Sequence, residues 1–165
     1  MKIQLMSHSD LPEVVRIQRE CYNDSILESV DSFSAKLSAA PDFCFIAVQD
    51  QQMVGYVVSL PWTFGAIPEL DGTEYSVPTN TDSLCIHDLA VSPSARKAGA
   101  AKGLLDAALE SAKQRGYQSI FLVAVQGASS YWQRHGFEVM QVDEATQRNL
   151  SAYGEDAVLM AKAAA

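Results

Sequence analysis

The chain has 165 residues, 48% of them hydrophobic, which is long enough for one sizeable core and too short for two full domains. A formal net charge of −8 leaves no broad basic field for unspecific binding to nucleic acid or to an anionic membrane. No apolar run is long enough to span a membrane or resembles a signal peptide, and the three cysteines have neither disulfide nor metal-ligand spacing. We therefore expect a single cytoplasmic domain over residues 1–165, with no bound metal.

The first half of the chain predicts a strand, two helices and a β-hairpin. After a short strand, Ser9 or Asp10 can cap a helix whose apolar side chains recur at helical spacing as far as Cys21. A second short helix ends before Pro41, which favours an extended conformation in the residue before it. Two β-rich runs then flank the turn 49–52 and are expected to pair as antiparallel strands. In chain order, these elements cover 3–6, 11–21, 31–37, 43–48 and 53–60.

The second half begins with an irregular segment, 61–82, which is rich in Pro, Gly, Thr, Asn and acidic residues and is expected to form an ordered loop. A buried strand, a helix with an apolar stripe and a second buried strand follow, and together they predict one right-handed βαβ unit. A short helix then ends at His135-Gly136, where glycine can adopt the left-handed cap. The elements of this half are expected over 84–91, 99–115, 119–125, 128–134, 137–142 and 157–161.

The turn between the strand 84–91 and the long helix has the composition of a diphosphate-binding site. Pro93 is followed by the cations Arg96 and Lys97, and small residues at 98–101 open the helix. Small residues let backbone N–H groups approach phosphate oxygens closely, and the start of a helix adds partial positive charge. An ordinary strand-to-helix turn with two solvated cations explains the same spacing equally well.

Two motifs resemble the GNAT superfamily of N-acetyltransferases. The run Asp88-Leu89-Ala90-Val91-Ser92-Pro93, followed by Arg96-x-x-Gly99-x-Ala101, is similar to the superfamily's acetyl-CoA signature, Arg/Gln-x-x-Gly-x-Gly/Ala. The later run from Ala128 to Phe137 resembles its aromatic-rich helix that ends in Gly-Phe. Together with the expected order of elements, the resemblance covers nearly the whole chain.

The resemblance implies a mixed α/β fold, in which a central twisted sheet is flanked by helices and splays between the strands 84–91 and 119–125. It implies acetyl-CoA as co-substrate, with pantetheine paired to the first of these strands and the diphosphate at the start of the long helix. Transfer to an amine is direct in this superfamily, so no cysteine nucleophile is required. The residues expected to bind acetyl-CoA are Leu89, Ala90, Val91, Arg96, Lys97, Ala98, Gly99, Ala100, Ala101 and Trp132.

His87 is the candidate base that removes a proton from the acceptor amine, and a structural histidine within the sheet is the alternative. An aliphatic ammonium is almost fully protonated at neutral pH, whereas an imidazole ordinarily titrates near pH ~6.5. Strand alternation predicts His87 on the same face as Leu89, close to the thioester, and Asp88 on the opposite face. The segment resembles the arylalkylamine N-acetyltransferase branch, in which histidines precede Leu-Ala-Val.

The resemblance does not supply a proton donor for the departing thiolate. Many relatives carry a tyrosine four residues before the glycine of the Gly-Phe pair, where this chain has Trp132. An indole N–H donates a hydrogen bond but is not an acid in this pH range. Tyr131 is therefore the alternative catalytic residue, with core packing as its competing role.

The resemblance places the acceptor between the first two helices and the loop after the third strand. Tyr22, Glu28 and Trp62 are the candidate substrate-binding residues there, because acids and aromatics hold an amine by charge and cation–π contact. A small primary amine is the expected acceptor, and the loop 61–82 favours it over a protein N-terminus or lysine. A non-catalytic acyl-CoA-binding regulatory module stays open because the tyrosine is absent. Members of the superfamily often form homodimers, and the sequence does not decide whether this chain does.

Overall fold

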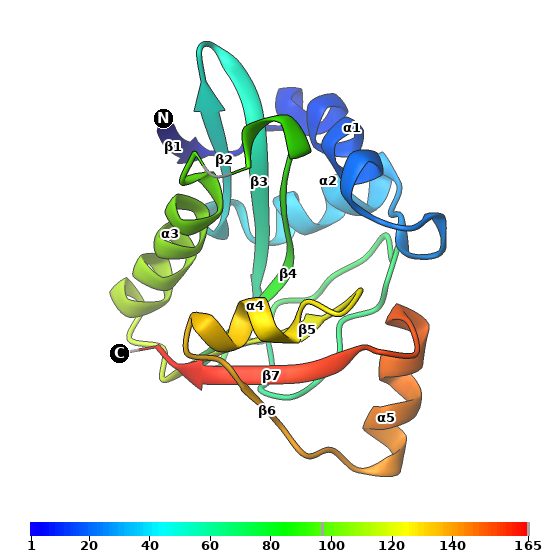
Figure 1. Cartoon of the computed structure of the whole chain (residues 1–165). Helices are drawn as coiled ribbons and strands as arrows, with labels where there is room; N and C mark the ends of the chain where they lie inside the picture. Colours follow the sequence, from blue (N-terminus) through cyan, green and yellow to red (C-terminus); the bar gives the residue numbers. More distant parts are fainter. Residues whose placement is uncertain (97, 165) are drawn as a thin grey trace.

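The computed structural model describes residues 1–96 and 98–164 and shows a seven-stranded mixed sheet (Figure 1). The strands lie in the order β1-β2-β3-β4-β5-β7-β6. All neighbouring strands are antiparallel except β4 and β5. This mixed α/β architecture confirms the expected fold class. The strands are β1 Lys2–Leu5, β2 Cys44–Gln49, β3 Gln52–Pro61, β4 Ser83–Val91, β5 Ser119–Ala124, β6 Glu138–Val139 and β7 Val158–Ala163.

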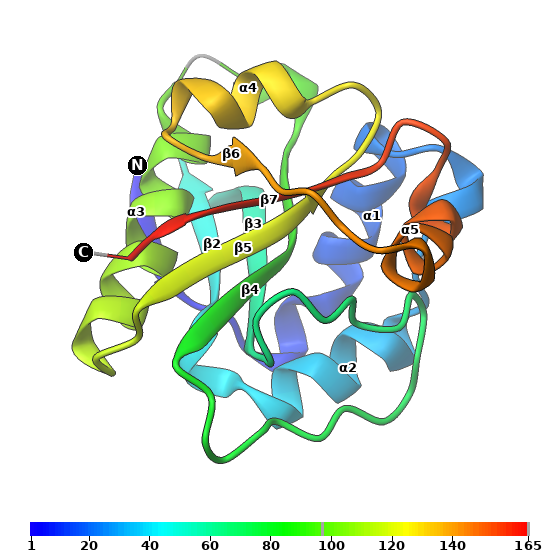
Figure 2. The same ribbon diagram turned by 90° about the horizontal axis from the view of Figure 1, so that it is seen from below.

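Helices cover both faces of the sheet. α1 (Leu11–Cys21) and α2 (Val30–Ala39) pack against β3 on one face, and α3 (Ala100–Gln114) packs against β2, β3 and β4 on the other (Figures 1 and 2). α4 (Ser129–Arg134) and α5 (Glu144–Leu150) lie beside the C-terminal strands. Within residues 1–96 and 98–164, no helix combines the length and the apolar character that crossing a membrane requires.

Local sequence explains where several elements begin and end. At the turn between β2 and β3, Asp50 and Gln51 have φ values of 52° and 66°, the left-handed conformation that a tight two-residue hairpin needs. Ser29 caps α2, because its side chain accepts a hydrogen bond from the N–H of Ser32. The apolar stripe expected on α3 is buried against the sheet, with Leu104, Leu105, Ala108 and Ala112 each at most 2% exposed.

Two C-terminal elements differ from the expected ones. The strand expected over 137–142 is only two residues long, because Glu138 and Val139 are the residues of this segment that pair with β7. α5 is absent from the expected elements, since its sequence is polar except for Ala145 and Leu150 and lacks an apolar stripe. The available signal was the cap, in which the Asp143 side chain accepts from the N–H of Thr146 at 2.8 Å.

β4 and β5 separate toward their carboxyl ends. They run parallel and pair over only four residues of each strand, 83–86 with 119–122. Beyond residue 86, β4 pairs only with β3, while β5 continues beside β7. The expected splay between these two strands is therefore confirmed, and it opens a gap in the middle of the sheet (Figure 2).

A β-bulge in β4 redirects the side chains beside this gap. Val58 of β3 lies opposite Asp88, but the next residue of β3 lies opposite the residue two positions earlier in β4, so His87 is extra. As a result, His87 and Asp88 both lie on the face covered by α1 and α2, whereas Leu89 packs in the core under α3. The predictions that His87 shares a face with Leu89, and that Asp88 points away from His87, are wrong because alternation fails at a bulge.

Candidate active site

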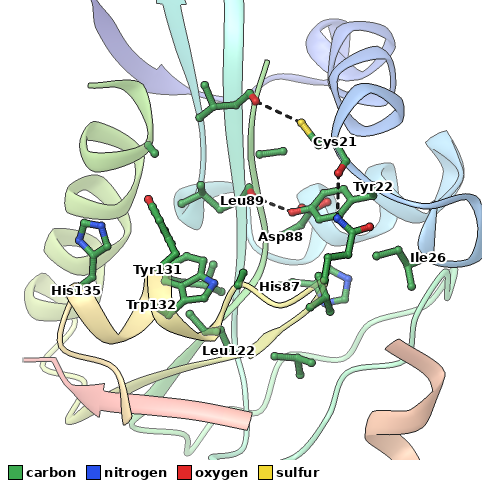
Figure 3. Close-up of a pocket in the computed structure, with 18 of the residues that line it drawn as sticks. Cys21, Tyr22, Ile26, His87, Asp88, Leu89, Leu122, Tyr131, Trp132 and His135 are labelled. Atoms are coloured by element: carbon green, nitrogen blue, oxygen red, sulfur yellow. Dashed lines mark hydrogen bonds between the residues drawn. The ribbon is translucent and has the colours of Figure 1, made fainter. Parts of the chain in front are cut away.

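The gap between β4 and β5 opens into a cavity of about 700 Å³ (Figure 3). Its walls come from the end of β4, the start of α3, the end of β5 with α4, and the connection between α1 and α2. Figure 3 shows Tyr22 and His87 on one side of β4, and Tyr131 and Trp132 of α4 on the other. The volume is that of a pocket for a small molecule or cofactor.

The start of α3 forms the positively polarised end of the cavity. Gly99 precedes the helix with a φ of 87°, and the first helical hydrogen bond runs from the Gly103 N–H to the Gly99 oxygen at 3.0 Å. The N–H groups of the first helical turn thus have no intrahelical acceptor. Apart from the neighbours of Gly99 in the chain, no atom of residues 1–96 and 98–164 lies within 4 Å of the position that a Cβ on Gly99 would occupy, so a ligand has room to approach the backbone. Arg96 is exposed nearby and adds a full positive charge.

The edge of β4 that faces the gap carries two carbonyl groups in contact with the end of α1. The ladder with β3 leaves the carbonyls of Leu89 and Val91 pointing away from β3. The Tyr22 hydroxyl donates to the Leu89 oxygen at 2.8 Å, and the Cys21 thiol donates to the Val91 oxygen at 3.3 Å (Figure 3). Arg96 Nε donates a second hydrogen bond to the Val91 oxygen at 3.4 Å. Because a carbonyl oxygen has two lone pairs, the Leu89 oxygen can still accept a further hydrogen bond from a ligand.

His87, Glu28 and Lys36 form a buried triad beside the cavity. His87 Nε2 lies 2.8 Å from Glu28 Oε1, Lys36 Nζ lies 2.6 Å from Glu28 Oε2, and no side chain of the three is more than 3% exposed. An ionised carboxylate only accepts hydrogen bonds, so Nε2 carries the proton and Nδ1 of the neutral ring holds the lone pair. Nδ1 makes no hydrogen bond within the described part of the chain, and His87 lines the cavity. His87 can therefore accept a proton at Nδ1.

Glu28 stays ionised although it is buried. Burial by itself raises the pKa of a carboxyl, but the charges and hydrogen bonds of His87 and Lys36 outweigh it and lower the pKa of Glu28 well below its ordinary value. Glu28 Oε2 also accepts from the backbone N–H of Asp71 at 2.7 Å and from the Ser32 hydroxyl at 3.3 Å. Both oxygens of Glu28 are thus taken by donors of the protein.

Asp88 carries a second carboxyl on the same face, and its environment raises the pKa of this carboxyl instead of lowering it. The Tyr56 hydroxyl donates to Asp88 Oδ2 at 2.8 Å, whereas Oδ1 is shielded from solvent and has no hydrogen-bond partner among residues 1–96 and 98–164. Burial and the negative charge of Glu28 raise the pKa of Asp88 to about 6, against the effect of the Tyr56 hydrogen bond. The fold therefore holds the ionised form of Asp88 at a cost in stability.

Replacing Asp88 with asparagine is expected to stabilise the fold at neutral pH. The carboxyl of an unfolded aspartate has a pKa of ~3.9. The folded value of about 6 is higher, so the stability of the wild type falls as the pH rises through this window. Asparagine removes a cost of about 1–3 kcal/mol at pH ~7.5. In urea unfolding, the advantage of Asp88→Asn should grow between pH ~4 and pH ~7.5. The same pH dependence in both proteins would contradict this expectation.

α4 forms an aromatic wall of the cavity. The ring of Tyr131 lies 5.1 Å from that of Trp132 and 4.9 Å from that of His135, measured between centroids. Trp132 is buried and also packs against Phe137 at 5.4 Å. Tyr131 is half-buried, and burial raises the pKa of its hydroxyl, although Arg134 opposes the rise. Tyr131 is thus a protonated hydrogen-bond donor at neutral pH.

The cavity brings together most of the residues predicted for the site. Ala98 and Trp62 do not border it, and Trp62 instead packs edge-on against Tyr75 at 6.3 Å between centroids. Lys97 lies outside the described residues. The predicted residues that line the cavity are Tyr22, Glu28, His87, Leu89, Ala90, Val91, Arg96, Gly99, Ala100, Ala101, Tyr131 and Trp132.

Lys36 and Tyr153 are among the residues of the site that the sequence prediction missed. The sequence could have indicated Lys36, because it lies on the buried row of α2 between Phe33 and Leu37. A lysine without a partner is unexpected there. Tyr153 packs its ring against His87 at 6.3 Å between centroids. Nothing in the local sequence indicates this contact, since Tyr153 follows the helix α5 that was not expected.

Residues 11–137, which include β4, the start of α3 and α4, match the sequence model of the acetyltransferase (GNAT) family. The chain belongs to the acetyltransferase (GNAT) family. No curated protein sequence matches it. Membership confirms the resemblance of the two motifs and makes the gap between β4 and β5 the candidate acyl-CoA site of a GNAT acyltransferase.

Solved structures of GNAT proteins share the fold over nearly the whole chain. The GphF GNAT-like decarboxylase in complex with isobutyryl-CoA matches with a TM-score of 0.79 and 15% identity, covering 100% of both chains. The ribosomal-protein-S18-alanine N-acetyltransferase from Escherichia coli matches at 0.69 and 16%, covering 99% of this chain and 94% of its own. The PaiA N-acetyltransferase from Thermoplasma acidophilum in complex with coenzyme A matches at 0.68 and 16%, covering 98% of each chain. At these identities the likeness shows the GNAT fold alone.

Proposed function

We propose that this protein is an acetyl-CoA-dependent N-acetyltransferase that acetylates a small primary amine. One observation carries the proposal: a single cavity joins the start of α3, the free edge of β4 and a histidine whose Nδ1 can accept a proton. These are the three parts that direct acyl transfer from a thioester to an amine requires. The resemblance of the segment around His87 to arylalkylamine N-acetyltransferases supports an amine as acceptor.

Acetyl-CoA would lie extended along the gap. The free N–H groups at the start of α3 and the charge of Arg96 suit the diphosphate. The carbonyl of Leu89 suits an amide group of pantetheine, which would continue the sheet where β5 has moved away. Complexes of two proteins of this fold with coenzyme A and with isobutyryl-CoA support a CoA derivative as the donor.

His87 is proposed to take the proton that the acceptor loses. The amine nitrogen attacks the thioester carbonyl carbon, a C–N bond forms, the C–S bond breaks, and the proton passes to Nδ1 of His87. Coenzyme A departs as a thiolate, which is tolerable because a thiol has a pKa of ~8.5. Tyr131 is the proposed hydrogen-bond donor to this sulfur, whereas the indole of Trp132 packs against the cofactor.

The loop between β3 and β4 supports a small acceptor over a protein. Residues 62–82 contain no helix or strand, and Leu70 of this loop lines the cavity. The loop is anchored to two residues that contact His87, by the bond from the Asp71 N–H to Glu28 and by the bond from the Tyr153 hydroxyl to the Pro68 oxygen. An anchored loop at this end of the cavity limits the space for a polypeptide acceptor.

Release of free thiol from acetyl-CoA tests the proposed function. We expect thiol release that depends on an added amine, in a panel of arylalkylamines, alkylamines and polyamines. Release only with peptides that carry a free N-terminus or lysine would instead assign a protein acceptor. Binding of acetyl-CoA without release in either panel would identify a non-catalytic module and refute the transferase.

Replacing Gly99 with glutamate is expected to weaken acetyl-CoA binding by roughly 100-fold, because a carboxylate would repel the diphosphate. Gly99 also has a φ of 87°, which a side chain strains. Gly99→Ala is the matched control, since it adds the strain without the charge. Calorimetric titration with acetyl-CoA should therefore rank wild type above Gly99→Ala and both far above Gly99→Glu. Undiminished binding to Gly99→Glu would mean that the diphosphate lies elsewhere.

A further inference from the structure

The buried triad contains a lysine for which the proposed reaction has no use. Lys36 Nζ contacts Glu28 Oε2 at 2.6 Å, Ser32 Oγ at 2.7 Å and the ring of Tyr75 at 4.7 Å from its centroid, and the side chain is 0% exposed. A buried ion pair often stabilises a fold less than apolar side chains of the same volume. Stability alone therefore does not explain why an ammonium is buried one contact away from His87.

The order of donors and acceptors in the triad determines where His87 holds its proton. While Lys36 donates to Oε2, Glu28 stays ionised and Oε1 can only accept from His87 Nε2. The neutral ring then has its lone pair on Nδ1. A protonated Glu28 could instead donate to Nε2, and the ring would carry its proton on Nδ1. In that tautomer, Nδ1 could no longer act as the base.

We propose that Lys36 is a positioning residue, which acts through Glu28 to hold His87 in the tautomer that accepts a proton at Nδ1. The catalytic meaning of this assignment rests on the proposed function, whereas the tautomer is a property of the folded protein. Glu28 then orients His87 and does not bind the acceptor, because its oxygens are taken by His87, Lys36, Ser32 and the N–H of Asp71.

The other groups that face Glu28 agree with this role. Among the described residues, the groups whose charges lower the pKa of Glu28 are His87, which is charged only when both ring nitrogens carry a proton, and Lys36. Beside a neutral His87 ring, Lys36 is the cation that offsets burial, so without Lys36 burial would raise the pKa of Glu28 and favour its protonated form. The remaining titratable groups that interact with Glu28 are Tyr22 at the end of α1, Asp88 of β4 and Tyr153 after α5.

NMR of isotope-labelled histidine tests the tautomer directly. We expect neutral His87 to carry its proton on Nε2 in the wild type and on Nδ1 in Lys36→Met. A wild type protonated on Nδ1, or an unchanged tautomer in Lys36→Met, would overturn the proposal. This measurement needs no acetyl transfer, so its failure is distinct from a failure of the proposed function, which the thiol assay detects.

Kinetic measurements distinguish a positioning role of Lys36 from a purely structural one. Lys36→Met is expected to lower kcat roughly 10- to 100-fold at neutral pH, with the KM for acetyl-CoA unchanged and activity recovering at alkaline pH as Glu28 ionises. In Lys36→Met/Glu28→Gln, a neutral pair should restore stability, but kcat should stay low because an amide does not fix the tautomer. A double variant with wild-type stability and wild-type kcat would show that Lys36 is only structural. Lys113→Met, an exposed lysine, is the control.

Discussion

Replacing Lys36 with methionine is expected to lower the free energy of unfolding by about 3–5 kcal/mol. The substitution keeps the volume of the side chain but leaves Glu28, which is 3% exposed, without its buried counter-charge. The loss follows from Glu28, which must either keep an unpaired charge or take up a proton, and not from a cavity. Urea unfolding at neutral pH, followed by circular dichroism, measures it.

The pH dependence gives this prediction a definite sign. In the wild type, the folded pKa of Glu28 lies below its unfolded pKa of ~4.3. Its contribution to stability is therefore fully present above pH ~4.3 and is lost as the pH falls through the folded pKa. The gap between wild type and Lys36→Met should shrink in acid, because a protonated Glu28 needs no cation.

Two further variants distinguish the effect of breaking the buried ion pair from the effect of removing any lysine charge. Lys36→Met/Glu28→Gln should recover most of the lost stability, since it removes both charges. Lys102→Met breaks an ion pair of similar length, 2.7 Å to Asp106, but Lys102 is 72% exposed, so its effect should stay within about 1 kcal/mol. A loss of that small size in Lys36→Met as well would mean that water or another group compensates Glu28.

Replacing His87 with alanine is expected to reduce kcat for amine acetylation by roughly 100- to 10,000-fold near neutral pH. The substitution removes the group that lines the cavity and holds a lone pair on Nδ1. Affinity for acetyl-CoA should be unchanged, because the start of α3 and the carbonyls of β4 are untouched. Steady-state rates over a range of pH, with calorimetry for acetyl-CoA, make the comparison.

The shape of the pH profile decides whether His87 is the base. The wild type should lose activity in acid as the imidazole becomes protonated, and His87→Ala should lack this limb of the curve. The same profile in both proteins would remove His87 from the mechanism. His8→Ala is the matched control, since His8 is exposed and bonds to Ser38 away from the cavity.

The fold was predictable where apolar residues recur along one face of an element, or where a polar turn separates two β-rich runs. α3 follows from its apolar stripe, and the hairpin of β2 and β3 follows from two β-rich runs around a polar turn. The splay of β4 and β5 came from the resemblance, because no local pattern encodes the separation of two strands. α5 was not predictable by periodicity, since its polar residues form no stripe.

The candidate site was predictable at its phosphate end and less so at its proton-accepting end. The segment from Arg96 to Ala101 carries its signal in consecutive residues. The bulge at His87 depends on pairing with β3, which the sequence of β4 alone does not contain. The contact of Glu28 with Lys36 joins two residues on either side of the start of α2, and their burial follows only from how α2 packs on the sheet.

The short pairing between β4 and β5 has a consequence for how long the protein survives. Only four residue pairs join β4 to β5, so the two halves of the sheet are connected at one end of these strands and separate at the other. A molecule bound along β4 would take the place of the missing pairs with β5, and it would bind only the folded chain. By mass action, every tenfold excess of such a molecule over its dissociation constant adds about 1.4 kcal/mol to the work of unfolding. The supply of acyl donor would then govern how long each copy survives proteolysis, as well as how fast it turns over.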